Sequence, residues 1–275
     1  MQKMRKILLF CYLKTRLSTQ IILQQALDFP QPKYVHLPLI LGPDKSKLSK
    51  RHGAVSVMAY QEQGFLPEAM VNYLALLGWS TTDSQQLFSK EEMIKKFSLK
   101  RIARNPAVFD MEKLQWMNGV YIKQTAPMEL ANLCREFTSQ KGKVENIQLE
   151  EIIKLYQGRI KLLPEIYSLG DFFFSLEIHI PEEICHEVLS KDGVKEILAE
   201  TKKVLSALEI FNPDTIEQAI RTMAERLGIK AADIIHPLRA VLTGKKVSPG
   251  IFEVAALLGQ ERVVQRIEYG LYMLG

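Results

Sequence analysis

Helix-breaking residues recur about every ten to twenty positions from residue 58 onward, and apolar residues at helical spacing fill the intervals between them. In the stretch LPEAMVNYLALLG, Pro67 stands where a first helical residue is expected and Gly78 where a left-handed stop is expected. Ser89 with Glu92 three residues later predicts a capping box. This pattern limits the chain to an array of helices and predicts a mainly α fold.

The second half of the chain continues the pattern. Met111, Leu114 and Met117 share one face of a helix that we expect to stop at Asn118-Gly119. Three more helices are predicted within 194–208, 212–228 and 248–259; the last two open with an X-Pro pair and close with glycine. The polar stretch TSQKGKVEN, residues 138–146, is the most linker-like part of the sequence and is the expected domain boundary. The sequence therefore divides into residues 1–58, 59–137 and 138–275.

The one convincing strand is predicted at residues 33–41, KYVHLPLIL, where apolar residues stand at every second position. Four basic residues follow within seven positions, between Gly42-Pro43 and Gly53. They are Lys45, Lys47, Lys50 and Arg51. Such a cluster is either a solvated surface or general nucleic-acid patch, or a hinged loop that holds a polyphosphate. The sequence GxxxxGK[ST] does not occur, so the loop is not a P-loop.

Composition excludes several classes of protein. The chain has 275 residues, of which 47% are hydrophobic and 24% charged, so wholesale disorder is not expected. The net charge of +5 is compatible with nucleic-acid binding without establishing it. Cys11, Cys134 and Cys185 form no CxxC pair, which predicts reduced thiols of an intracellular protein and no zinc site. No apolar run reaches the length of a membrane span.

The basic start MQKMRKILLFCYLKTRLS allows three interpretations. It has features of a signal peptide and of a mitochondrial presequence, since no acidic residue precedes Asp28. We favour a basic amphipathic segment of a cytoplasmic protein, with a mitochondrial location as the alternative.

The basic loop contains the string KLSKR at residues 47–51, after HLPLILGPDKS and before HGAVSVMAYQEQGFLPEAMVNYLALLGWS. This stretch resembles the signature loop of class I aminoacyl-tRNA synthetases of the glutamyl type. The resemblance continues through NPAVFDMEKLQWMNGVYIK (105–123) and IHPLRAVLTGKKVSPGIFEVAALLG (235–259). The chain is identified as a member of the glutamate–tRNA ligase family, bacterial or organellar type. The family implies a remnant of an α/β nucleotide-binding domain at 1–58, then helical stem-contact and anticodon-binding regions.

The resemblance implies an enzyme that joins glutamate to ATP, supplied with Mg²⁺, and transfers the glutamyl group to tRNA(Glu). By its position in the motif, Lys50 is expected to contact the ATP phosphates. The resemblance implies that Lys47, Ser49, Lys50 and Arg51 form a mobile catalytic loop. Backbone groups of Leu39 and Ile40 match positions that flank the adenine.

The RNA is expected to contact the region after the loop. Residues 89–123 carry eight basic against four acidic residues, and the resemblance makes Arg101 and Arg104 candidates for contact with the inner corner of tRNA. Arg159 in YQGRIKLLPEI is the candidate for anticodon contact, with a helix salt bridge as the alternative. Trp79 and Trp116 follow apolar stripes and are expected in the core. DFFF, residues 171–174, is expected to pack at a helix junction.

One part of the family pattern does not occur in this sequence. None of the five histidines stands in a His-x-Gly-His motif, which supplies the other half of the ATP site in the family. We therefore expect that this chain does not activate glutamate alone. We expect it to be a monomer, unless a separate N-terminal partner completes it. The alternative function is a non-catalytic tRNA-binding protein derived from a synthetase. Two other enzymes of this type are disfavoured. A paralogue acting on a modified tRNA base would resemble only the catalytic half of the family. A glutaminyl enzyme would have a β-barrel anticodon region, whereas helices are predicted here.

Overall fold

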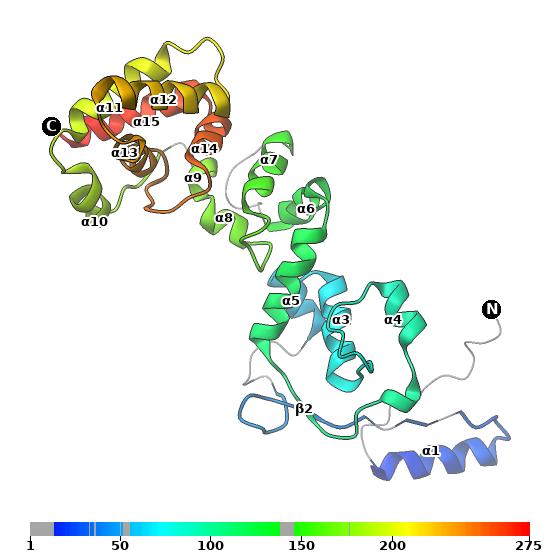
Figure 1. Cartoon of the computed structure of the whole chain (residues 1–275). Helices are drawn as coiled ribbons and strands as arrows, with labels where there is room; N and C mark the ends of the chain where they lie inside the picture. Colours follow the sequence, from blue (N-terminus) through cyan, green and yellow to red (C-terminus); the bar gives the residue numbers. More distant parts are fainter. Residues whose placement is uncertain are drawn as a thin grey trace. The chain divides into compact units, whose positions relative to one another are not determined.

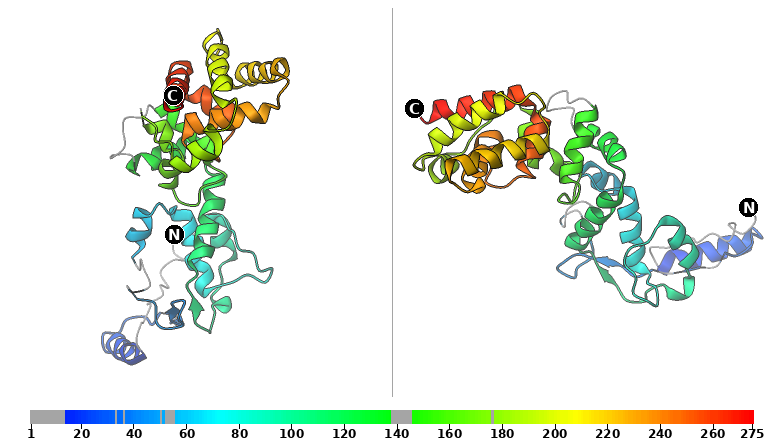
Figure 2. Two further views of the ribbon diagram at one scale, coloured as in Figure 1. Left: turned by 90° about the vertical axis from the view of Figure 1, so that its left-hand side faces the viewer. Right: turned by 45° about the horizontal axis from the view of Figure 1, so that its top comes forward.

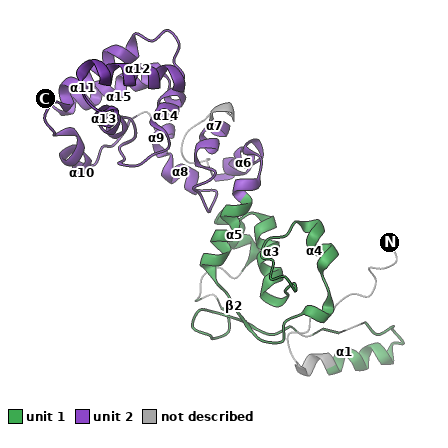
Figure 3. Cartoon of the chain, in the orientation of Figure 1, with its two compact units in different colours: residues 1–121 green, residues 122–275 purple. Residues whose placement is uncertain are grey.

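The computed structural model describes residues 14–32, 34–35, 37–49, 51, 56–137, 146–175 and 177–275. The chain is mainly helical, as predicted from the sequence (Figure 1). Its residues form two compact units, 1–121 and 122–275, which are coloured separately in Figure 3. Most of the expected boundary at 138–146 lies outside the described residues, so the division into three parts stays a prediction.

The first unit combines short helices with one small parallel sheet. Its elements are α1 (Lys14–Ala26), β1 (Ile40–Leu41), α2 (Val57–Glu62), α3 (Pro67–Gly78), α4 (Lys90–Lys96), the 3-10 turn η2 (Leu99–Arg101), β2 (Ala107–Val108) and the first part of α5 (Met111–Gln124). An aromatic cluster forms part of the core, in which the Tyr73 ring meets Phe109 edge-on with centroids 5.2 Å apart. The buried Tyr73 hydroxyl accepts from Asp110 N at 2.7 Å and donates to Asp110 O at 2.9 Å, which fixes the start of α5.

The predicted strand at 33–41 is much shorter than expected, because only Ile40 and Leu41 pair with β2 and both are half-buried rather than buried. Pro38 has no N–H to donate to a ladder, which limits the strand on its N-terminal side. Residues 33 and 36 lie outside the described residues.

For tertiary reasons, one predicted helix end has the right position but the wrong conformation, and another has the wrong position. Gly78 is the last residue of α3 rather than a left-handed stop, and its carbonyl accepts from Ala103 N at 2.8 Å. Likewise α5 passes through Asn118-Gly119 to Gln124. The fully buried Asn118 side chain accepts from Leu66 N at 2.8 Å and donates to Gly64 O at 3.3 Å, so it anchors the loop before α3 instead of capping α5.

The two tryptophans differ in burial. Trp79 is buried against Phe88 and Phe97, as predicted. Trp116 is 46% exposed, which contradicts the prediction, because the inner face of α5 is formed by its fully buried neighbours Leu114 and Met117.

All the regular secondary structure among the described residues of the second unit is helical. Its elements are the end of α5, α6 (Pro127–Cys134), η3 (Arg135–Phe137), α7 (Asn146–Tyr156), α8 (Glu165–Leu169), α9 (Asp171–Phe174), α10 (Glu182–Ile184), the π-helical turn η4 (Cys185–Leu189), α11 (Val194–Ser206), α12 (Pro213–Leu227), α13 (Ala231–Thr243), α14 (Ile251–Leu258) and α15 (Gln260–Met273). Helices α11–α15 pack together in every view of Figures 1 and 2.

Local signals set the ends of α12 as predicted. Asn212 accepts from Thr215 N at 2.9 Å at the start of the helix, and Gly228 adopts φ 66° at its end. Helix α14 ends at Leu258 with Gly259 as its C-cap, as predicted, but it begins at Ile251, after the X-Pro pair Ser248-Pro249 expected to open it.

The DFFF stretch lies at a helix junction, as predicted. Phe172 and Phe173 of α9 are buried with ring centroids 4.5 Å apart. The buried Arg266 of α15 donates to the carbonyl oxygens of Leu242 at 2.6 Å, Phe172 at 2.7 Å and Ser175 at 2.9 Å. It therefore ties α9 and the end of α13 to α15, with its charge stabilised by backbone dipoles.

Candidate functional site

The basic loop begins as a tight turn directly after β1. Gly42 N donates to Ser46 O at 2.8 Å, and Lys45 adopts a left-handed φ of 60° at the tip. The chain then runs back antiparallel to β1, with a bridge between Leu41 and Lys47 and a bond from Leu48 N to Ile40 O at 3.0 Å. Residues 45–49 are thus outside any helix, and the turn presents the exposed Lys45 and Lys47.

Asp44 holds this turn together. Its carboxylate accepts from Ser46 N at 3.0 Å and from Ser46 Oγ at 2.8 Å, and forms an exposed ion pair of 3.2 Å with Arg51. The Arg51 guanidinium also donates to Ser46 Oγ at 2.5 Å. Part of the positive charge of the loop is therefore balanced within the loop.

The loop residues proposed from the sequence differ in how far the structure describes them. Lys50, the expected phosphate contact, lies outside the described residues. Ser49 is half-buried, Leu39 is 45% exposed, and the Ile40 carbonyl is already engaged by Leu48 N.

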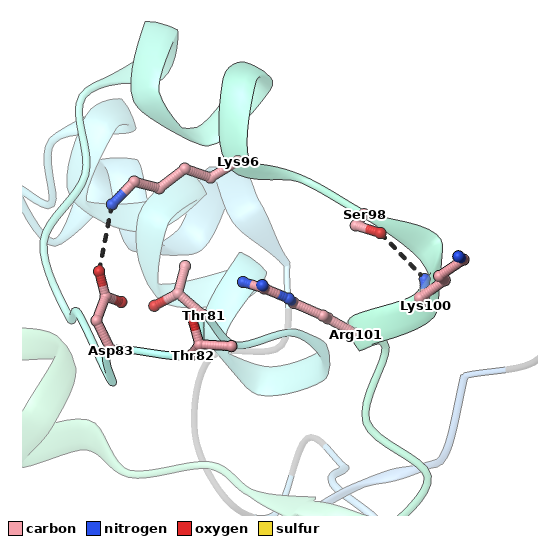
Figure 4. Close-up of a pocket in the computed structure, with 7 residues that line it drawn as sticks. All are labelled: Thr81, Thr82, Asp83, Lys96, Ser98, Lys100 and Arg101. Carbon is pink, nitrogen blue, oxygen red and sulfur yellow. Dashed lines mark hydrogen bonds and ion pairs between the residues drawn. The ribbon is translucent and has the colours of Figure 1, made fainter.

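A second basic site opens in the first unit, where three chain segments line a pocket of about 400 Å³ (Figure 4). The segments are the loop after α3, the last turn of α4, and η2 with the residue before it. The lining residues are Thr81, Thr82, Asp83, Lys96, Ser98, Lys100 and Arg101. Arg101 extends toward Thr81 and Thr82, and Lys96 extends toward Asp83. One predicted RNA contact, Arg101, thus lies in a pocket that sequence spacing did not reveal.

Asp83 is the one acidic residue of this lining. Hydrogen bonds from the Thr81 hydroxyl and from Gln85 N, together with the charge of Lys96 at 3.5 Å, lower the pKa of Asp83 to about 2. Lys96 also donates to Gln85 Oε1 and lies 5.7 Å from the centre of the Phe88 ring. Asp83 and Lys96 are therefore paired with each other.

The other two arginines predicted to contact RNA, Arg104 and Arg159, are exposed. Arg159 lies near Arg239 of α13, a residue that the sequence analysis missed. Burial, and after it the charge of Arg159, lower the pKa of Arg239, whose Nε is buried without a hydrogen-bond partner in the described structure. Neither guanidinium forms an ion pair with a described carboxylate, so the alternative of a salt bridge for Arg159 finds no support here.

The described residues contain neither a candidate metal site nor a candidate membrane span. Within these ranges no group of three or more His, Cys, Asp or Glu side chains is arranged to hold a metal ion. No helix in the same part of the chain is long and apolar enough to cross a membrane.

Comparison with known proteins places both units in described families. Residues 12–116 match the family "tRNA synthetases class I (E and Q), catalytic domain", and residues 129–271 match the family "Anticodon binding domain". Together with the helical fold, these matches define the class: a class I aminoacyl-tRNA synthetase of the glutamate and glutamine type.

Comparison with individual relatives distinguishes the glutamate type from the glutamine type within this class. The chain is 39% identical over 253 residues to glutamate–tRNA ligase 1 of Caldanaerobacter subterraneus, covering 90% of this chain and 53% of that protein. It is 40% identical over 256 residues to glutamate–tRNA ligase 2 of Caldicellulosiruptor saccharolyticus, covering 90% and 52%. The crystal structure of a glutamate tRNA ligase from Elizabethkingia meningosepticum in complex with its amino acid superposes with a TM-score of 0.83 at 27% identity, covering 95% of this chain and 55% of that one.

The chain belongs to the glutamate–tRNA ligase family, as the sequence motifs indicated. It spans about half the length of the curated relatives that it matches.

Proposed function

We propose that this chain takes part in the ATP-dependent attachment of glutamate to tRNA(Glu), as the segment that holds the ATP phosphates and the tRNA. The observation that carries this proposal is that one chain matches both the class I catalytic family and the anticodon-binding family. The helical second unit supports glutamate rather than glutamine chemistry, because the glutaminyl enzymes are expected to carry a β-barrel there.

In this proposal Lys47, Ser49, Lys50 and Arg51 form the loop that closes on the ATP phosphates, and Lys50 contacts them directly. Ammonium groups placed beside the departing pyrophosphate stabilise the charge that develops on its oxygens. The exposed Lys45 and Lys47, presented on a turn just after β1, support this assignment. Backbone groups of Leu39 and Ile40 would flank the adenine, and Mg²⁺ would arrive with the nucleotide as part of the substrate.

Arg101 and Arg104 are proposed to contact the inner corner of the tRNA, and Arg159 the anticodon. Their exposure supports both assignments, and the absence of a described counter-ion beside Arg159 supports a role for an external anion or base. We retain the division into 1–58, 59–137 and 138–275, and a cytoplasmic, monomeric protein, as parts of the same proposal.

Glutamate activation is proposed to require residues beyond those of this chain, because its sequence contains no His-x-Gly-His motif to complete the ATP site. The same observation favours the second candidate, a non-catalytic tRNA-binding protein. The intact KLSKR string favours the first.

Equilibrium binding of ATP and of tRNA(Glu) to the purified chain separates the two candidates. The proposal expects both to bind, with ATP binding lost in Lys50→Ala, whereas a non-catalytic binder would hold tRNA alone. Pyrophosphate exchange with glutamate, ATP and tRNA should be absent. Turnover comparable to that of a full-length synthetase would contradict the proposal that this chain cannot activate glutamate alone.

A further inference from the structure

The pocket beside η2 carries more positive charge than the protein itself neutralises. Lys96, Lys100 and Arg101 line it together with a single carboxylate, that of Asp83, which is engaged by Lys96. In the described part of the chain, the side chains of Lys100 and Arg101 form no hydrogen bond or ion pair. Two unbalanced cations therefore border one hollow of about 400 Å³.

The arrangement of these cations differs from that of an ordinary solvated helix face. A lysine in the last turn of α4 is expected there, because it complements the helix dipole. Lys100 and Arg101, however, belong to η2, a separate turn that brings its positive charge to the same hollow as Lys96 (Figure 4). Crowding of like charges from separate segments is unfavourable unless an anion compensates it.

The polar groups of the pocket match the oxygens of a phosphate group. Arginine presents a planar fork of donors that suits phosphate oxygens, and lysine adds a compact charge at the rim. The Ser98 hydroxyl accepts from Lys100 N at 3.4 Å, which leaves its own hydrogen to donate. None of the seven lining residues is aromatic, so the pocket offers no ring on which a base could stack.

We infer that this pocket binds a phosphodiester group of the RNA backbone, with Arg101 as its main ligand and Lys100, Lys96 and Ser98 around it. The inference rests on the proposed tRNA-binding function and deepens it, since contacts of this kind position an RNA without reading its sequence. Asp83, which pairs with Lys96 at 3.5 Å, competes with the bound phosphate for the charge of Lys96.

This arrangement makes an unusual prediction, because one substitution should strengthen binding. Asp83→Asn removes the competing charge but keeps an oxygen that can accept from Gln85 N, which now bonds Asp83 at 3.3 Å. It should tighten tRNA binding by about two- to fivefold. Arg101→Ala should weaken binding by roughly three- to tenfold and reduce the slope of log affinity against log salt by about one.

Lys95→Ala is the matched control. Lys95 lies in the last turn of the same helix as Lys96 but does not line the pocket. Its loss should weaken binding by less than about twofold. The experiment measures filter binding of tRNA(Glu) to the whole chain over a salt series, with circular dichroism to verify folding of each variant, and calorimetric titration with inorganic pyrophosphate.

The possible results distinguish the pocket from the wider function. If the wild type binds tRNA but Arg101→Ala and Lys95→Ala behave alike, the pocket inference is overturned while the proposed function stands. If pyrophosphate binds more weakly to Arg101→Ala than to the wild type and tRNA does not bind, the pocket holds a free anion and the RNA assignment is wrong. If neither binds, both the pocket inference and the proposed function fail.

Discussion

Arg51 donates to the carboxylate of Asp44 at 3.2 Å, so an acidic residue within the basic loop holds the loop in its turn conformation. Replacement Asp44→Ala removes this ion pair and both bonds from Ser46. Both partners are exposed, so we expect global stability to change by less than about 1 kcal/mol. Local opening should increase about fivefold, and tryptic cleavage after Lys45 or Lys47 should accelerate by a similar factor.

Asp44→Asn serves as the control for this test, since the amide keeps an oxygen for Ser46 while losing the charge. Its cleavage rate should fall between those of the wild type and the alanine variant. Equal rates for all three proteins would show that Asp44 does not hold the turn.

Gly270 permits a close approach of α15 to α13. A Cβ on Gly270 would lie 2.4 Å from Val241 Cγ1 and 3.2 Å from Val241 Cβ. Gly270→Ala should therefore lower the free energy of unfolding by about 1–2 kcal/mol, because overpacking outweighs the better helix propensity of alanine. Urea unfolding measures this loss. In a double variant with Val241→Ala the two costs should be less than additive, and strict additivity would contradict the contact.

The low pKa of Asp83, about 2, predicts an acid-dependent contribution to stability. A depressed folded-state pKa means that the native state favours the carboxylate. Its stabilisation is therefore present above the ordinary aspartate pKa of 3.8 and is lost as the pH falls toward about 2. The difference in thermal midpoint between wild type and Asp83→Asn should be constant above about pH 4 and shrink below it. A difference that does not change across this window would contradict the shift.

The two described cysteines should differ in reactivity. Burial raises the pKa of the Cys134 thiol to about 12, whereas Cys185 is half-buried. Since the thiolate is the reactive form, a neutral-pH thiol reagent should label Cys185 well before Cys134. Peptide mass spectrometry distinguishes the sites, and unfolding in urea should equalise their rates. Equal labelling in the native protein would contradict the burial of Cys134.

Arg159 is predicted to contact the anticodon. Arg159→Ala should weaken tRNA(Glu) binding by about tenfold, and Arg159→Lys should restore little if the planar guanidinium is required. Arg221→Ala is the control. Arg221 already pairs with Glu217 of its own helix at 2.6 Å, so its replacement should not change the affinity for tRNA(Glu). Full recovery with lysine would indicate a simple phosphate contact instead.

Features that depend on neighbours within one helical turn could be predicted from the sequence. The capping box of α4 is an example: Ser89 Oγ accepts from Glu92 N at 3.1 Å, and Glu92 accepts from Ser89 N at 2.9 Å. The N-cap at Asn212 and the left-handed conformation of Gly228 likewise depend only on residues nearby in the sequence. Such signals need no knowledge of the tertiary fold.

Features that depend on distant partners could not be predicted in this way. The continuation of α5 past Asn118 is decided by bonds to residues 52 and 54 positions earlier in the chain. The pocket beside η2 and the approach of Arg239 to Arg159 likewise join separate segments. For the basic loop, the sequence predicted the cluster of basic residues and its position after a strand, but not the ion pair between Asp44 and Arg51.

The most direct test of the account compares the binding of tRNA(Glu) with that of a transcript that differs only in its anticodon, across a range of salt concentrations. We predict that this chain binds tRNA(Glu) with an affinity that falls as salt rises, and binds the altered transcript at least about tenfold more weakly. Equal binding of the two transcripts, or no binding of either at low salt, would contradict the claim that the helical second unit recognises this tRNA.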